Sequence, residues 1–145
     1  MISREFRVFV DLEGHQYHYG TFPEDLVESS LRPDIILWND TENKVILAEL
    51  TCPMEHNMEA AFIRKLLKYD SLKKELEHKG FDVSFFPFEV TARGICAVTV
   101  SEFLMNININ YGRKKSAELK YRLSKMALSS SHTIFLKRNN RYWLS

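Results

Sequence analysis

The chain has 145 residues, of which 45% are hydrophobic and 27% charged, with only five Gly and four Pro. This composition indicates one compact globular domain over residues 1–145 and excludes collagen-like and disordered classes. A chain of this size can bury roughly two-thirds of its unfolded surface, so it needs neither a disulfide framework nor a structural metal to fold. No apolar run approaches the ~20 residues that span a bilayer, and the first residues lack a signal peptide's apolar core. We therefore expect a soluble, intracellular protein without membrane contact, in which Cys52 and Cys96 are two buried thiols.

The net charge of +1 hides a strong asymmetry along the chain. Residues 1–60 hold four Lys/Arg against twelve Asp/Glu, whereas residues 111–145 hold nine Lys/Arg against the single Glu118. An acidic half that collects divalent cations beside a basic tail that contacts phosphates is typical of an enzyme acting on nucleic acid. Two solvated faces would give the same composition.

The first part of the chain predicts strands. A hairpin is expected from Phe6–Val10 and Gln16–Phe22 around the turn residues 11–14, followed by a connector over Pro23–Ser30. A second hairpin is expected from Ile35–Trp38 and Val45–Leu50, because residues 39–43 have turn composition.

The second part predicts a long helix and then shorter elements. Residues 54–79 lack Gly and Pro and end at Gly80, which favours a helix closed by a glycine cap. Pro87 falls in the strand that is expected next along the chain, and proline in a strand is typical of an edge strand or of a bulge. The remaining expectations are a strand over 82–90, a strand over 94–100, a helix capped by Ser101 to about Ile107, a basic helix over 113–128, a polar break at 129–132, and closing segments at 133–136 and 142–144. This order predicts an α/β sheet layered with helices.

The second hairpin brings two acids together. If its turn centres between Thr41 and Glu42, Glu49 lies across from Asp34, and directly opposed residues point to the same face. Two like charges beside apolar residues need a compensating cation, and carboxylate oxygens suit Mg²⁺ or Mn²⁺. The alternatives are strand-end acids that reach solvent, or a salt bridge to Arg32.

The long helix adds lysines to this region. Its apolar stripe, at 100° per residue, includes Lys65, with Lys68 at the margin. A lysine aimed at a buried sheet face needs a partner, and the carboxylate pair is the obvious one. The alternative is a lysine whose stem packs while its ammonium reaches water.

These segments, RPDIILWN, VILAELT and IRKLLKY, resemble the PD-(D/E)xK nuclease superfamily. More narrowly, residues 31–95 are similar to the restriction-like endonuclease domains of non-LTR retrotransposon and related reverse-transcriptase proteins. The resemblance implies a restriction-endonuclease-like fold with a central mixed sheet and flanking helices. It implies a Mg²⁺- or Mn²⁺-dependent DNA endonuclease in which Asp34, Glu49 and the Leu50 carbonyl hold the metal.

One position departs from the usual pattern of the superfamily. Thr51 stands where most members have lysine, and the retrotransposon branch supplies the lysine from the next helix, here Lys65 or Lys68, with Tyr69 beside them. Glu24 and Glu28 are candidates for an accessory acid. The departure leaves open an inactive module that keeps the fold and binds nucleic acid.

The basic residues are expected to contact DNA phosphates, and such contacts give affinity for DNA without recognising its base sequence. Arg93 is expected either to contact substrate or to form an ion pair with Glu89. The expected nucleic-acid contacts are Arg32, Arg93, Arg113, Lys114, Lys115, Lys120, Arg122 and Lys125. Targeting would then come from a reverse transcriptase or another domain of the same element, in the nucleus. A third hypothesis is a protein-interaction domain whose exposed patch contains Phe85, Phe86, Phe88, Tyr142 and Trp143.

Overall fold

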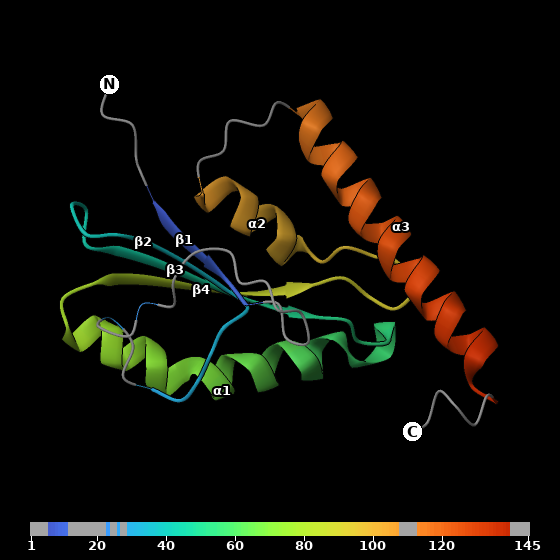
Figure 1. The fold of residues 1–145 in the computed structure, drawn as a ribbon, viewed down its shortest axis with the longest axis horizontal. Coiled ribbons are helices and arrows are strands. Elements are labelled where there is room, and N and C mark those ends of the chain that lie inside the picture. The colour runs from blue at the N-terminus through green and yellow to red at the C-terminus, as the bar shows by residue number, and fades with distance from the viewer. Residues whose placement is uncertain (1–5, 12–22, 24–25, 27–28, 108–112, 140–145) are drawn as a thin grey trace. The chain divides into compact units, whose positions relative to one another are not determined.

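The computed structural model describes residues 6–11, 23, 26, 29–107 and 113–139. These residues form an α/β protein, as the order of predicted elements indicated (Figure 1). Its elements are β1 (Arg7–Val10), β2 (Ile35–Asn39), β3 (Lys44–Thr51), a short 3-10 helix (Glu55–Asn57), α1 (Met58–His78), β4 (Asp82–Glu89), α2 (Val98–Asn106) and α3 (Arg113–Lys137).

The chain divides into two compact units. The first unit comprises Met1–Leu50 and Phe62–Phe88, and the second comprises Thr51–Ala61 and Glu89–Ser145. Except for the last residues of β3 and β4, the sheet belongs to the first unit together with most of α1, whereas α2 and α3 belong to the second.

The four strands form one mixed sheet in the order β1-β2-β3-β4. β1 pairs antiparallel with β2, and β2 pairs antiparallel with β3, whereas β4 runs parallel to β3. The strand predicted at Phe6–Val10 is confirmed as β1, and its partner in the structure is β2. The segment predicted to pair with it, Gln16–Phe22, lies outside the described residues.

The hairpin of β2 and β3 has the predicted register, with Trp38 opposite Val45 and Ile36 opposite Leu47. Its turn is held by the Asn39 side chain, whose Oδ1 accepts a hydrogen bond from the Glu42 amide at 3.0 Å. Asn43 completes the turn with a φ of 48°, a left-handed conformation that asparagine tolerates better than most residues. The turn chemistry therefore fixes which residues of the two strands face each other.

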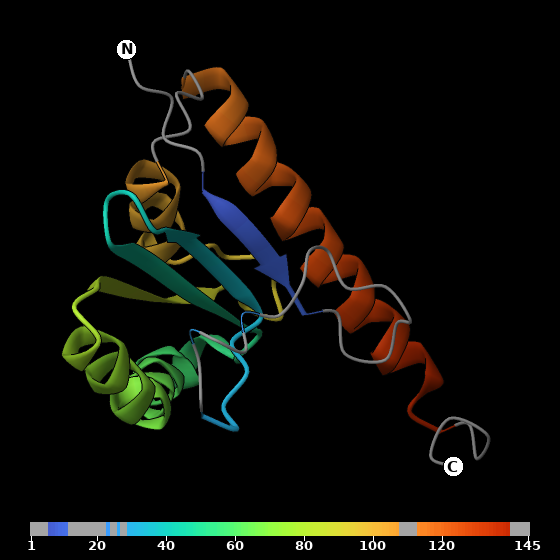
Figure 2. The same cartoon turned by 60° about the vertical axis from the view of Figure 1, so that its left-hand side comes forward.

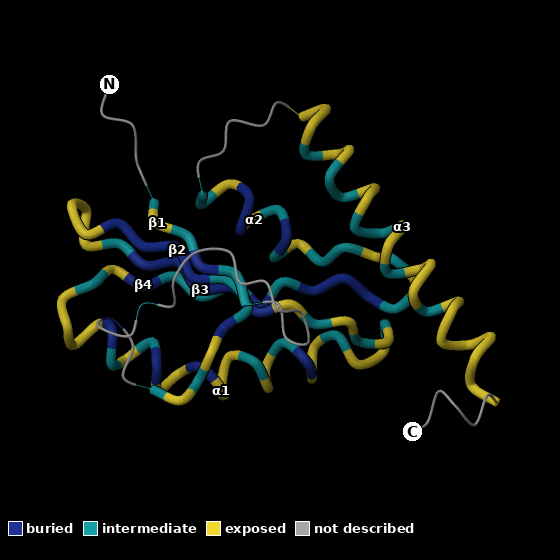
Figure 3. The backbone as a smooth tube through the Cα atoms, viewed as in Figure 1, coloured by how far each residue is buried: buried dark blue, intermediate teal, exposed yellow. Residues whose placement is uncertain are grey.

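The core of the first unit lies between the sheet and α1. Helix α1 runs along one face of the sheet, which Figure 2 shows from a second direction. Tyr69, Leu72 and Leu76 of the predicted helical stripe are fully buried against Val45 and Leu47 of β3. Figure 3 shows the burial of each element: β2 and β3 are mostly buried, whereas α3 is mostly exposed.

The end of α1 matches its sequence signals. Gly80 has a φ of 92°, and the Phe81 amide returns to the Leu76 carbonyl at 3.2 Å, as expected for a glycine-capped helix. Pro87 lies in β4, which is an edge strand of the sheet. Proline has no amide hydrogen to donate, but the outer side of an edge strand has no neighbouring strand to accept one, so no hydrogen bond of the sheet is lost there.

The second unit differs from the sequence prediction in several places. The strand expected over 94–100 is wrong, because only Val90 and Cys96 form an isolated bridge and α2 begins at Val98. Ser101 lies inside α2 and does not cap it, since the N-cap is Ala97. The basic helix continues to Lys137, through the polar segment expected to interrupt it and through 133–136. The closing segment at 142–144 lies outside the described residues.

Helix α3 is fixed within its unit by contacts from one side. Lys120 Nζ donates a hydrogen bond to Ser101 Oγ of α2 at 2.5 Å, and Cys96 Sγ lies 3.5 Å from Ser124 Oγ. The prediction of two buried thiols is wrong, because Cys52 is exposed and Cys96 is only half-buried. None of the helices in the described part of the chain is long and apolar enough to cross a membrane.

Two glycines with positive φ allow a matched test of how closely α3 packs. A Cβ added at Gly94, where φ is 85°, would lie 2.6 Å from the Ser124 carbonyl oxygen, whereas a Cβ at Gly80 would meet nothing within 4 Å. Gly80→Ala should cost about 1–2 kcal/mol for the left-handed backbone alone. Gly94→Ala should cost roughly 1–3 kcal/mol more, because the backbone of α3 must move. Urea unfolding of both variants measures the difference, and equal losses would contradict the close approach.

Candidate functional site

The mouth of the β2–β3 hairpin brings Asp34 and Glu49 together. The register that pairs Ile35 with Ala48 places these two acids opposite each other one step further on. The Leu50 amide donates a hydrogen bond to Asp34 Oδ2 at 2.6 Å, and the Asp34 amide donates one to Glu49 Oε2 at 3.2 Å. Asp34 is half-buried, and Glu49 is 5% exposed. The Glu49 carboxylate is therefore held by the backbone of Asp34, and the Asp34 carboxylate is held by the backbone of Leu50, the residue after Glu49.

Helix α1 places two ammonium groups on the other side of Glu49. Lys65 Nζ lies 2.6 Å from Glu49 Oε1, and Lys68 Nζ lies 3.3 Å from the same oxygen. The two lysines differ in their surroundings, because the Lys65 side chain is 19% exposed and that of Lys68 is 44% exposed. Lys65 is thus the enclosed partner of the carboxylate, and Lys68 is the partner open to solvent.

Tyr69 of α1 completes the cluster from its buried side. Its hydroxyl oxygen lies 2.8 Å from Glu49 Oε2 and 3.2 Å from the Arg32 carbonyl, and it accepts a hydrogen bond from Lys68 Nζ at 3.0 Å. The hydroxyl has one proton to donate, and the carboxylate is the closer and charged acceptor. The ring is fully buried, and its centroid lies 5.0 Å from that of Phe85. Tyr69 therefore joins the apolar core to the polar site.

The charge on Glu49 is maintained by these neighbours. Burial alone would raise the pKa of this carboxyl group, but the hydrogen bonds from Lys65 and Tyr69 and the charges of Lys65 and Lys68 outweigh burial and lower the pKa. Glu49 is thus a buried carboxylate that stays ionised.

The oxygen donors at this site fit a small divalent cation of the Mg²⁺ type. Such ions are commonly held by one or two protein carboxylates, with water and phosphate oxygens completing the shell. Among the described residues, no group of three or more His, Cys, Asp and Glu side chains is arranged to hold a metal. The predicted accessory acids, Glu24 and Glu28, lie outside the described residues. Among the described residues, the carboxylates placed to hold such an ion are those of Asp34 and Glu49, with the Leu50 backbone beside them.

The predicted nucleic-acid contacts are distributed over several elements. Arg32 is exposed just before β2. Arg93 Nη1 lies 3.8 Å from Glu55 Oε2, so its acidic partner is Glu55 and not Glu89, as the ion-pair alternative had it. The other predicted contacts lie on α3, which carries Arg113, Lys114, Lys115, Lys120, Arg122 and Lys125.

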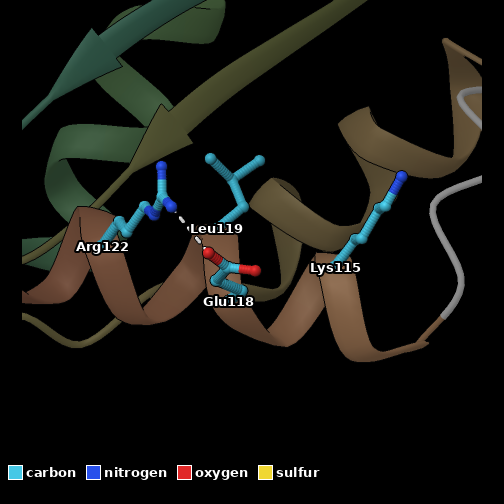
Figure 4. Close-up of a pocket in the computed structure, with 4 residues that line it drawn as sticks. All are labelled: Lys115, Glu118, Leu119 and Arg122. Carbon is cyan, nitrogen blue, oxygen red and sulfur yellow. Dashed lines mark hydrogen bonds and ion pairs between the residues drawn. The ribbon is translucent and has the colours of Figure 1, made fainter.

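Lys120 and Arg122 of α3 are engaged with neighbouring side chains. Lys120 binds Ser101, and Arg122 lies 2.6 Å from Glu118. Lys115, Glu118, Leu119 and Arg122 line a pocket of about 290 Å³ on this helix, and Figure 4 shows the Arg122–Glu118 pair within it. An acidic side chain in the pocket reduces its attraction for an anion.

The aromatic patch proposed for protein interaction is not formed by the strand residues. Phe85, Phe86 and Phe88 are half-buried in β4, and none of them belongs to the exposed class. They contribute to packing, as the contact of Phe85 with Tyr69 shows. Tyr142 and Trp143 lie outside the described residues.

Glu89 is a buried acid outside the predicted site residues. It is 3% exposed at the end of β4, and its Oε1 has no hydrogen-bond partner among the described residues. Burial raises the pKa of this carboxyl group. Its position after an apolar strand is the only sequence signal for its burial.

The Glu89 carboxyl group should make stability depend on pH. Because its pKa is raised in the folded state, its favourable contribution is present below the ordinary glutamate pKa and is lost as the pH rises through the folded value. Glu89→Gln should therefore raise the free energy of unfolding at pH 7 by more than roughly 0.5 kcal/mol, beyond the range typical of surface substitutions. Urea unfolding at pH 4 should show a smaller gain.

Glu118→Gln on exposed α3 is the control, and its effect should stay within roughly ±0.5 kcal/mol at both pH values. A loss of stability in Glu89→Gln at pH 7 would show that Glu89 is ionised and paired.

Comparisons with known proteins give no relative: no family model, no curated protein and no solved structure matches this chain.

Proposed function

We propose that the chain is a metal-dependent DNA endonuclease domain of mobile-element origin, with a restriction-endonuclease-like PD-(D/E)xK fold. The observation that carries the proposal is the meeting of Asp34, Glu49 and two lysines of α1 at one hairpin mouth. The resemblance of residues 31–95 to retrotransposon endonuclease domains supports the same function.

Asp34, Glu49 and the Leu50 carbonyl would hold a Mg²⁺ or Mn²⁺ ion. The Leu50 amide already faces Asp34, and the amide and carbonyl of one strand residue project to the same side of the strand. When bound, the ion supplies Lewis-acid polarisation of the phosphate and a water of lowered pKa.

The two lysines have different roles in this proposal. Phosphodiester cleavage adds negative charge to the phosphoryl oxygens, which fixed positive groups stabilise. Lys65 and Tyr69 orient the Glu49 carboxylate, because both bind it in the buried part of the site. Lys68 is more exposed and further from Glu49, so its ammonium is the group available to a substrate phosphate.

Metal binding requires one change in the contacts of Glu49. Its two oxygens receive hydrogen bonds from Lys65, Lys68, Tyr69 and the Asp34 amide, which fill its roughly four lone-pair positions. The contact with Lys68 is the longest of these, and Lys68 is the more exposed lysine. Lys68 therefore moves from the carboxylate toward the substrate when a cation binds.

The alternative function is a nucleic-acid-binding module without cleavage. The observation that favours it is the complete neutralisation of Glu49 by Lys65 and Lys68, which needs no cation. Thr51, at the position where most PD-(D/E)xK enzymes have lysine, points the same way. Under either function, a reverse transcriptase or a targeting domain of the same element would direct the chain to its DNA in the nucleus.

Asp34→Asn tests the proposed metal site with little disturbance of the fold, because the asparagine oxygen can still accept the Leu50 hydrogen bond. We expect Mg²⁺- or Mn²⁺-dependent nicking of supercoiled plasmid to fall by at least about 10²-fold. Calorimetric titration with Mn²⁺ should show weaker binding by the variant, and thermal unfolding should show an intact fold.

Asp70→Asn is the matched control on the exposed side of α1, where Asp70 pairs only with Lys74 among the described residues. Its nicking and Mn²⁺ binding should equal those of the unmodified chain. Nicking that survives in Asp34→Asn would refute the endonuclease proposal. DNA retention without nicking in the unmodified chain, with either metal, would establish the binding module instead.

Lys65→Gln and Lys68→Gln should separate stability from activity. Loss of Lys65 removes a hydrogen bond to a buried charge and should cost about 1–3 kcal/mol in unfolding. Loss of the more exposed Lys68 should cost no more than about 1 kcal/mol. Lys68→Gln should nevertheless lower nicking by roughly 10²-fold, because it removes positive charge from the transition state.

Mn²⁺ titration distinguishes this role of Lys68 from a structural one. Removing an ammonium group that competes for Glu49 should tighten Mn²⁺ binding by Lys68→Gln even as nicking falls. Weaker Mn²⁺ binding together with slower nicking would contradict the competition between Lys68 and the cation.

A further inference from the structure

The solvent side of α3 presents an aromatic ring between two lysines. Lys114, Tyr121 and Lys125 are seven and four residues apart, so they lie on one side of the helix. All three residues are exposed. The three positions extend over about 16 Å of helix at about 1.5 Å per residue. We call Lys114, Tyr121 and Lys125 the tyrosine face of α3.

The packing of α3 leaves this face accessible. The helix is held in its unit through Lys120 and Ser124, which contact Ser101 and Cys96. Tyr121 is 65% exposed. Among the described residues, no side chain stacks on its ring or bonds to its hydroxyl group. Burial in the fold therefore does not account for a large aromatic side chain at this position.

Phe135 lies two heptads beyond Tyr121 on α3, and the contacts of its ring differ from those of the Tyr121 ring. It is 57% exposed, but the Arg138 guanidinium lies 3.8 Å from its ring centroid. One face of the Phe135 ring is thus covered by a cation of the same chain, which leaves Tyr121 as the better stacking surface on α3.

The charge of α3 indicates what the tyrosine face would bind. The helix carries seven Lys/Arg against Glu118, and Glu118 is engaged with Arg122. Lys114 and Lys125 are exposed on either side of Tyr121 along the helix. A polyanion with flat apolar groups complements this arrangement, since phosphates meet the lysines while a planar group stacks on the ring.

We propose that the tyrosine face of α3 binds an unpaired strand of nucleic acid, with one base stacked on Tyr121 and phosphates contacted by Lys114 and Lys125. In a duplex each base face is covered by its neighbours, so a duplex would engage the lysines and not the ring. The proposal goes beyond the cleavage function and does not depend on it, because all three residues lie outside the Asp34–Glu49 site.

Fluorescence anisotropy with labelled probes in EDTA tests the proposal on the full chain carrying Asp34→Asn. The single-stranded probes are an oligothymidine of about 15 nucleotides and an oligouridine of the same length, which are longer than the smallest sites of single-strand binders. The third probe is a DNA duplex. Tyr121→Ala should weaken binding of both single strands at least about fivefold, while duplex binding changes less than about twofold. Tyr121→Phe should bind like the parent, and Tyr121→Leu should bind like Tyr121→Ala.

The lysines are tested through salt dependence. Lys125→Ala should reduce the slope of log affinity against log salt by about 0.7, the value for one single-strand phosphate contact. Phe135→Ala and the exposed Lys74→Ala of α1 are controls, and both should bind like the parent.

Three results would overturn the proposal. Parental binding by Tyr121→Leu would show that the ring does not stack on a base. Equal losses for duplex and single strands would assign the face to duplex phosphates. Retention on phosphatidylserine vesicles without binding of any oligonucleotide would assign it to an anionic lipid surface. Because every assay uses the Asp34→Asn chain in EDTA, these outcomes are independent of whether the chain cleaves DNA.

Discussion

The first unit depends on one buried charge, the carboxylate of Glu49. Removing a carboxylate from water costs several kcal/mol, and the cost is recovered only when hydrogen bonds and opposite charge surround it. Here the Asp34 amide, Lys65, Lys68 and Tyr69 meet that requirement. These donors come from the segment before β2 and from α1, while Glu49 lies on β3. The requirement to satisfy one side chain therefore fixes the relative position of three segments of the fold.

The parts of this arrangement that follow local rules could be predicted from the sequence. The turn composition gives the hairpin register, and the register places Glu49 beside Asp34. The helical period places Lys65 in the same stripe as the buried Tyr69, and Gly80 ends the helix. Each of these inferences needs only a repeat distance and one turn, so no knowledge of distant contacts is required. The metal and the reaction are proposals, since they depend on groups outside the chain.

The errors arose where distant contacts decide the structure. The β-branched residues of 98–100 favour a strand, but they begin α2, whose Val100, Phe103 and Leu104 are buried together on one side. The serines from Ser129 onward favour a polar break, yet the segment contains neither Gly nor Pro to end a helix, and α3 passes through it. The exposure of Cys52 and the lack of a partner for Glu89 Oε1 among the described residues depend on neighbours that spacing does not reveal.

The order in which the site's charges come together has a consequence for folding. Asp34 and Glu49 are 15 residues apart and belong to one hairpin, whereas Lys65 and Lys68 arrive only when α1 docks. A hairpin that closes before the helix docks confronts two like charges without their counterions. Final closure of the strand ends and docking of α1 are thereby coupled energetically, because each makes the other more favourable. The two acids thus make closure of the strand ends more favourable once the helix has brought its lysines into place.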